Sequence, residues 1–171
     1  MSDDSYGFVR VPMVTLQRIT HDNLQEIVGL SVAENQRRFV ASNAQSIMDA
    51  YVAITNDGIA LPFGIYDGDH AVGFIMLTYG MKKDASMPDV AYHNYCIWRL
   101  MIDAKYQGQG YGKRAIRKAL EYMRSFPCGP AEYCWLNYEP ENVAAKALYE
   151  RCGFTETGER FFGEIVAARR L

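Results

Sequence analysis

The stretch that decides the fold is Ile97-Trp-Arg-Leu-Met-Ile-Asp-Ala-Lys-Tyr-Gln-Gly-Gln-Gly-Tyr-Gly112. Residues 97–102 are an apolar run interrupted only by Arg99, which predicts a mostly buried strand. Glycines then occupy three alternate positions, and an amphipathic helical pattern with many basic residues follows. This order indicates an anion site, because glycines let backbone N–H groups converge and a helix N-terminus carries positive potential. The expected guest is a phosphate or pyrophosphate.

Two common phosphate motifs do not fit this spacing. The dinucleotide fingerprint needs Gly-x-Gly-x-x-Gly, whereas the glycines here stand at every second position. The nucleotide P-loop needs Gly-Lys followed by Ser or Thr, but Gly112-Lys113 is followed by Arg114. A tight strand-to-helix turn without a ligand is the structural alternative. The spacing Gln107-x-x-Gly110-x-Gly112 resembles the pyrophosphate loop of the GCN5-related N-acetyltransferase (GNAT) family.

Length and composition predict one globular domain over residues 1–171. The chain is 49% hydrophobic and 22% charged, with a net charge of −2, which does not favour a nucleic-acid partner or a membrane surface. No apolar run approaches the ~18 residues of a membrane span, and the first residues lack a signal-peptide pattern, so we expect a cytoplasmic protein. The four cysteines and three histidines lack metal-pair spacing, and no metal is expected.

The small net charge hides an asymmetry along the chain. Residues 1–70 carry nine acids and four bases, whereas residues 71–171 carry eleven acids and fourteen bases. Six of these bases fall between Lys105 and Arg124, against one acid. Most of them are expected on a solvated helix face, where they would also attract an anionic ligand.

The hydrophobic pattern predicts a mixed α/β order without repeats or linkers. Strands are expected at residues 13–18, 62–66, 71–79, 91–102, 132–137, 154–157 and 161–169, with an Asp-Gly hairpin at 67–70 and a polar loop at 81–89. Helices are expected after an Asp22 cap, over residues 43–51, from the glycine stretch to about 125, and from an Asn142 cap to 152. The helix at 43–51 would bury a stripe of Ala44, Ile47, Met48 and Tyr51. The strands before and after the third helix should be parallel.

A second motif lies at Asn142–Phe154, which has the form Asn-x-x-Ala-x-Ala-Leu-Tyr-x-x-Cys-Gly-Phe. An Asn-capped helix ending at Gly153 is common in proteins, and Tyr149 would then be an ordinary core residue. One β-α-β unit after the first motif, however, this stretch resembles the second motif of the same GNAT family. The resemblance implies that family's α/β fold, a central mixed sheet of six or seven strands flanked by about four helices.

Shorter stretches are similar to one subgroup of the family, the bacterial spermine/spermidine (diamine) N-acetyltransferases. They are residues 32–36, 39–43, 66–69, 98–103 and 163–164. The subgroup likeness implies transfer of an acetyl group from acetyl-CoA to a primary amine, with a polyamine as the leading acceptor, and a homodimer. Other acceptors, such as an aminoglycoside-like drug, an amino acid or a peptide N-terminus, stay open. So does a non-catalytic acyl-CoA-binding sensor.

The resemblance also implies which residues hold acetyl-CoA. The strand backbone would pair with the pantetheine amides, the glycine loop would cradle the pyrophosphate, and the capping Asn and the Tyr of the second motif would contact the cofactor. In this chain these residues are Leu100, Met101 and Ile102 for the strand, Gln107, Gly108, Gln109, Gly110, Tyr111 and Gly112 for the loop, and Asn142 and Tyr149.

Acetyl transfer to an amine needs an acid and a base. Tyr149 matches the family's general acid, which protonates the departing thiolate. An alkyl ammonium has a pKa near ~10 and must lose a proton before it attacks. Glu34 is the leading candidate base because it lies in an unusually polar stretch, and Glu164 is the second. The expected acceptor pocket includes Glu34, Glu164 and Tyr92, with His93 and Tyr95 beside it, and the acids Glu34 and Asp49 should face it.

Overall fold

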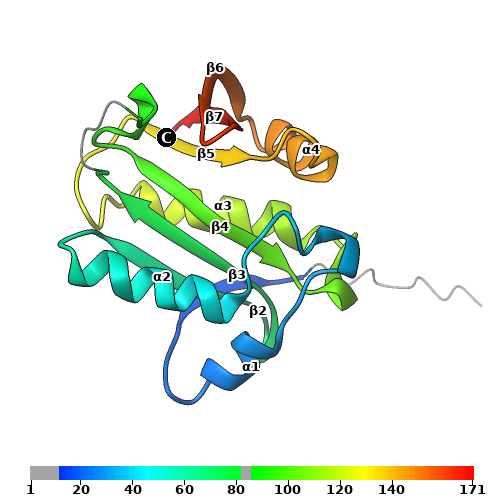
Figure 1. Cartoon of the computed structure of the whole chain (residues 1–171). Coiled ribbons are helices and arrows are strands. Elements are labelled where there is room, and N and C mark those ends of the chain that lie inside the picture. Colours follow the sequence, from blue (N-terminus) through cyan, green and yellow to red (C-terminus); the bar gives the residue numbers. More distant parts are fainter. Residues whose placement is uncertain (1–11, 82–85) are drawn as a thin grey trace, which may run out of the picture.

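The computed structural model describes residues 12–81 and 86–171 (Figure 1). Residues 1–11 and part of the predicted loop at 81–89 therefore lie outside the described residues. Within them the chain forms a seven-stranded mixed sheet in the order β1-β2-β3-β4-β5-β7-β6. The strands are β1 (Val14–Arg18), β2 (Ala60–Asp67), β3 (His70–Tyr79), β4 (Tyr95–Ile102), β5 (Tyr133–Tyr138), β6 (Thr155–Phe161) and β7 (Glu164–Arg170). All neighbours are antiparallel except β4 and β5, which are parallel as predicted.

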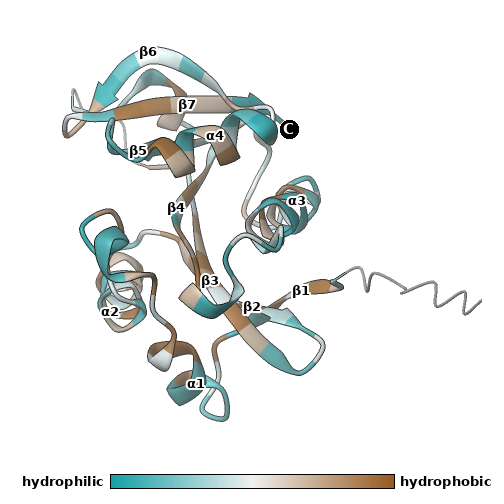
Figure 2. Cartoon of the chain, turned by 90° about the vertical axis from the view of Figure 1, so that its right-hand side faces the viewer, coloured by the Kyte–Doolittle hydropathy of each residue, from teal (hydrophilic) through white to brown (hydrophobic). Residues whose placement is uncertain are grey.

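Four α-helices flank the sheet in the described residues: α1 (Leu24–Gly29), α2 (Asn43–Thr55), α3 (Tyr111–Met123) and α4 (Val143–Arg151). Short 3-10 turns, named η1 (Glu34–Gln36), η2 (Asp89–Ala91) and η3 (Ala104–Tyr106), stand in the connections. Figure 2 shows α1 and α2 on one face of the sheet and α3 on the other. No helix in the described part of the chain is long and apolar enough to cross a membrane.

The core has a layer on each side of the central strands. The apolar stripe of α3, which includes Ile116 and Leu120, is buried against the sheet, as its helical spacing predicts. On the opposite face, Ile27 of α1 and Ala50 of α2 pack against Phe74 and Met76 of β3. β3 is covered on both faces, which explains why its sequence is an almost continuous run of apolar residues.

Two helix predictions need correction. α1 begins at Leu24 after Asn23, not after Asp22, and the Asn23 side chain accepts a hydrogen bond from the Thr20 N–H instead of capping α1. The predicted buried stripe of α2 is also wrong, because Met48 and Tyr51 are mostly exposed.

The buried side of α2 is partly polar. It consists of Asn43, Ser46 and Ala50. The Asn43 amide donates to the Ile27 carbonyl at 2.8 Å, and the Ser46 hydroxyl donates to the Ser42 carbonyl at 3.0 Å. These internal bonds allow polar groups to be buried where periodicity alone favours apolar ones.

Two strand predictions also change. β4 begins at Tyr95, not at residue 91, because η2 follows Pro88 and His93 adopts a left-handed φ of 54°. Phe161 ends β6, whereas the sequence pattern placed it at the start of the final strand; the turn residues between β6 and β7 are Phe162 and Gly163. The hairpin at Asp67 to His70 is confirmed.

Candidate active site

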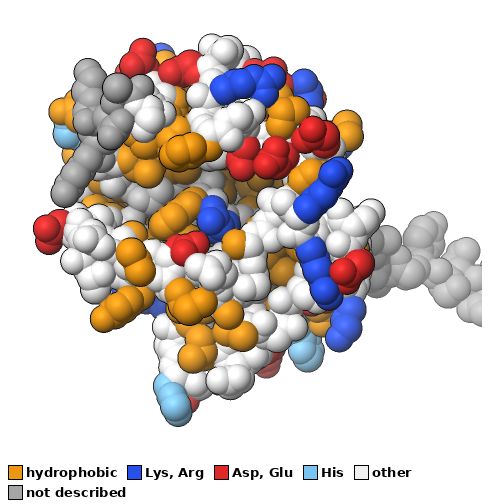
Figure 3. Space-filling model, in the orientation of Figure 1, with side chains coloured by type: hydrophobic (Ala, Val, Ile, Leu, Met, Phe, Trp, Pro, Cys, Tyr) orange, Lys and Arg blue, Asp and Glu red, His pale blue; other side chains and the backbone are white. Residues whose placement is uncertain are grey.

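A pocket of about 1030 Å³ opens where β4 and β5 separate. These two strands pair only through Tyr95 with Cys134 and Cys96 with Trp135. Beyond those pairs the strands diverge, and α4 and the β6–β7 turn border the pocket on the β5 side. Figure 3 shows this hollow, with acidic and basic side chains around it.

A bulge in β4 shapes the floor of the pocket. The pairing with β3 passes from Arg99 opposite Met76 to Ile97 opposite Leu77, so Trp98 is an extra residue in β4. The guanidinium of Arg99 lies 5.3 Å from the centre of the Trp98 ring and 3.5 Å from the Asp49 carboxylate of α2. Its buried Nε has no hydrogen-bond partner among the described residues.

The last residues of β4 offer a free backbone edge. Leu100, Met101 and Ile102 pair with β3 on one side. On the other side they do not pair with β5, because the two strands have separated after Cys96 and Trp135. All three residues line the pocket. An extended, peptide-like ligand can therefore add to this edge as a strand would.

The glycine loop forms one end of the pocket. Gly108 and Gly110 have φ values of 76° and 83°, and Gly110 is the residue that precedes the first turn of α3. Gly108 lines the pocket, and a Cβ at this position would meet open space. These features suit an anion that approaches the N–H groups of the loop and of the first turn of α3.

Other residues of the loop hold it in place. The Tyr111 hydroxyl donates to the buried Asp67 carboxylate at 2.8 Å, and the Gln109 side chain donates to the Lys105 carbonyl. A Cβ at Gly112 would come within 3.1 Å of Leu148, so this glycine lets α3 and α4 pack closely.

Gln107 connects both sides of the pocket. Its Nε2 donates to the Ile102 carbonyl at 2.9 Å and to Gln36 Oε1 of η1 at 2.8 Å. This bond holds η1 against the glycine loop, at the end of the pocket where cationic side chains gather (Figure 3). The cations that line the pocket include Arg37, Arg38, Lys113 and Arg151.

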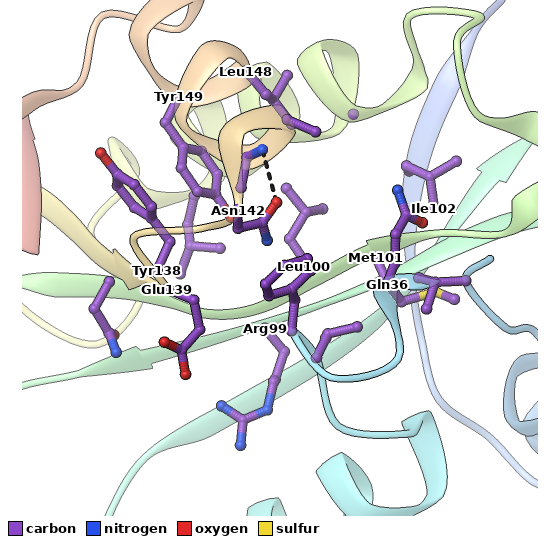
Figure 4. Close-up of a pocket in the computed structure, with 18 of the residues that line it drawn as sticks. Gln36, Arg99, Leu100, Met101, Ile102, Tyr138, Glu139, Asn142, Leu148 and Tyr149 are labelled. Carbon is purple, nitrogen blue, oxygen red and sulfur yellow. Dashed lines mark hydrogen bonds between the residues drawn. The ribbon is translucent and has the colours of Figure 1, made fainter. Parts of the chain in front are cut away.

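Helix α4 brings Asn142 and Tyr149 to the middle of the pocket (Figure 4). The Asn142 side chain accepts from the Ala145 N–H at 3.1 Å, which is the predicted cap, and Gly153 ends the helix with a φ of 81°. The half-buried Tyr149 has its pKa raised above the usual value, first by burial and then by nearby groups that include Cys96 and Glu164. Its hydroxyl therefore stays protonated at neutral pH.

Carboxylates surround the other end of the pocket. Glu164, at the start of β7, accepts a hydrogen bond from the Asn137 amide. Burial raises the pKa of Glu164, the Glu139 charge raises it further, and Arg99 opposes that rise. Glu139 follows directly after β5 and lies beside Arg99 in Figure 4.

Glu139, which lines the pocket, is absent from the site residues that the sequence patterns indicate. The available signal was its position, since polar residues that follow the carboxyl end of a strand in a parallel pair commonly face a ligand crevice.

Four predicted acceptor-site residues do not line the pocket: Glu34, Tyr92, His93 and Tyr95. Glu34 pairs with Arg37 at 3.0 Å, and its side chain is 81% exposed. Tyr92 packs its ring 4.0 Å from His93, away from the pocket lining. Tyr95 is fully buried in the core, where its hydroxyl donates to the Gly129 carbonyl and accepts from the Cys128 N–H. Of the two predicted acids, only Asp49 approaches the pocket, through Arg99.

Residues 30–154 match the Acetyltransferase (GNAT) family, and the chain belongs to this family. It is 30% identical to the spermine/spermidine N(1)-acetyltransferase of Bacillus subtilis (strain 168), over 92% of this chain and 99% of that protein. The fold is similar to a crystal structure of aminoglycoside acetyltransferase AAC(6')-Ib in complex with coenzyme A, with a TM-score of 0.74, 14% identity, and coverage of 92% of this chain and 95% of that one. It also resembles spermidine N-acetyltransferase from Vibrio cholerae in complex with CoA and spermine, with a TM-score of 0.62, 23% identity, and coverage of 92% and 94%.

Proposed function

We propose that this acetyltransferase transfers an acetyl group from acetyl-CoA to a primary amine of a polyamine. The observation that carries the acceptor assignment is the charge at the β5 end of the pocket. Three carboxylates lie near the guanidinium of Arg99: Asp49 pairs with it at 3.5 Å, Glu139 lies beside it in Figure 4, and Glu164 feels its charge. This cluster has an excess of negative charge, which attracts an acceptor that carries several positive charges. The names of the relatives in Bacillus and Vibrio support the same acceptor class.

The pocket residues fit acetyl-CoA as the donor. The free edge from Leu100 to Ile102 suits the two pantetheine amides, and the open space at Gly108 in the pocket suits the pyrophosphate. Asn142 lies between these regions and Tyr149. When bound, acetyl-CoA supplies an acetyl group activated as a thioester.

Tyr149 is proposed as the general acid. Its hydroxyl is protonated at neutral pH, so Oη can donate that proton to the departing thiolate, which leaves as the neutral thiol of CoA. None of the described residues forms a hydrogen bond with that hydroxyl, which leaves it available to a ligand.

Glu164 replaces Glu34 as the proposed base, because Glu164 lines the pocket and Glu34 does not. A carboxylate whose pKa is raised toward the working pH accepts a proton from an ammonium group with a smaller energetic mismatch. Glu139 and Asp49 attract the other ammonium groups of the acceptor in this scheme. Arg99 keeps the cluster from carrying three uncompensated charges.

One assay tests the assignment. The purified full chain would be given acetyl-CoA with spermidine, spermine, an aminoglycoside, an amino acid or a peptide, and CoA release would be measured. We expect the highest kcat/KM with a polyamine. Higher kcat/KM with any other amine would overturn the polyamine assignment, and tight acetyl-CoA binding without turnover of any amine would indicate a sensor.

A further inference from the structure

The turn between β6 and β7 holds an aromatic residue in a conformation that it rarely adopts. Phe161 and Glu164 face each other as the last strand pair, so Phe162 and Gly163 are a two-residue turn with φ values of 49° and 88°. Turns with two positive φ values favour Asn-Gly or Asp-Gly, because a bulky side chain at the first position is strained. Phe162 is also 86% exposed. Neither local backbone preference nor core packing explains a phenylalanine here.

The surroundings of Phe162 point to a ligand. Its ring lies 4.5 Å from that of Phe161, which in turn lies 6.1 Å from the ring of the buried Trp135. All three residues line the pocket, and Glu164, the proposed base, comes two residues after Phe162. A row of aromatic rings that line the pocket therefore runs from the buried Trp135 out to the exposed Phe162.

We propose that Phe162 determines acceptor specificity by contacting the far end of a long polyamine. This inference rests on the proposed function. A polyamine alternates apolar methylene segments with ammonium groups, and aromatic faces bind both kinds of group. The ammonium group that reacts lies near Glu164, so only an acceptor long enough to leave the pocket reaches the outermost ring. Strain at Phe162 is then retained because the ring binds substrate.

The chain offers a matched control for a test. Phe126, which follows α3, also has a left-handed φ, 51°, and is partly exposed, but it does not line the pocket. Phe162→Asn and Phe126→Asn both place a residue that tolerates this backbone conformation. Relief of about 1 kcal/mol of backbone strain should raise the Tm of either variant by about 2–4 °C in a chain of this length. Phe162→Gly is a second way to remove the ring.

The decisive measurement is the ratio of kcat/KM for spermine to kcat/KM for 1,3-diaminopropane. We expect Phe162→Asn and Phe162→Gly to lower this ratio roughly 2- to 5-fold through KM for spermine, as loss of an exposed cation–aromatic contact would. Phe126→Asn should leave the ratio unchanged. An unchanged ratio in both Phe162 variants would overturn the inference while the proposed function stands. Absence of amine acetylation by the unmodified protein would instead overturn the proposed function.

Discussion

The rings of Tyr138 and Tyr149 lie 5.6 Å apart in the pocket, yet their hydroxyls have different surroundings. That of Tyr138 donates to the Glu156 carboxylate at 2.8 Å, whereas that of Tyr149 is free to meet a ligand. We therefore expect Tyr149→Phe to lower kcat by about 100-fold or more, the usual contribution of a general acid.

Tyr138→Phe is the control for that experiment. It removes a hydroxyl from the neighbouring ring and a hydrogen bond to Glu156, and should reduce stability by about 1 kcal/mol while largely preserving kcat. Steady-state kinetics across pH and thermal denaturation would compare both variants. Equal kcat losses would argue against proton donation by Tyr149.

Glu164→Gln tests the proposed base in two ways. We expect kcat with a polyamine to fall by about 100-fold, because the amide cannot accept the proton.

Stability of the Glu164→Gln variant at neutral pH should rise, because the raised pKa of Glu164 means that the folded state binds its proton more tightly than the unfolded state. Stability of the parent protein therefore declines as pH rises from the unfolded pKa through the folded pKa. Denaturant titrations should show the gain at pH 7 and little difference below about pH 4, where both states are protonated. A variant that loses stability at pH 7 would contradict this account.

Glu139→Gln should shift the pH profile. The Glu139 charge raises the pKa of Glu164, so removing that charge should lower this pKa. The acid limb of kcat/KM should then move to lower pH, while KM for the polyamine rises because the pocket loses one negative charge. The exposed Glu121, paired with Lys118 at 2.8 Å on α3, offers a charge-matched control in Glu121→Gln. If Glu139→Gln and Glu121→Gln shift the acid limb of the kcat/KM profile equally, the shift comes from the change in net charge of the protein and not from the carboxylates of the pocket.

Two glycine substitutions should have opposite effects on stability. A Cβ at Gly73 would clash with the backbone carbonyl of Met101, so Gly73→Ala should force β3 and β4 apart and cost roughly 1–3 kcal/mol. A Cβ at Gly29, at the end of α1, would meet open space, and Gly29→Ala should stabilise by about 0.5–1 kcal/mol. Urea unfolding would measure both. A neutral Gly73→Ala would mean that the strand pair can separate without loss.

Much of the fold could be predicted because local patterns and tertiary structure agree. The stripe of α3, the parallel β4–β5 pair and the Asn142 cap follow from periodicity, connection rules and capping chemistry. Glycine spacing predicts a tight loop from Gln107 to Gly112, and the positive φ values at Gly108 and Gly110 explain the glycines there.

The errors arose where distant contacts decide. Asn43 is buried because it reaches the Ile27 carbonyl, a partner that helical periodicity does not reveal. Glu34 looked unusual in its polar stretch, but it pairs with Arg37 on the surface. Glu139 and Glu164 are separated in sequence and become one site only when β5 and β7 pair. Charge patterns along the chain located the acidic half, but not the acids that share a pocket.

Two residue pairs join β4 to β5, and the rest of this seam has no strand pairing among residues 12–81 and 86–171. If acetyl-CoA supplies the missing contacts, part of the structural integrity of the sheet comes from a metabolite. Binding to the folded state alone stabilises it by mass action, by about 2.7 kcal/mol when the ligand stands at 100 times its Kd. The persistence of the protein against unfolding and proteolysis would then rise and fall with the acetyl-CoA supply, which couples its abundance to the metabolic state of the cell.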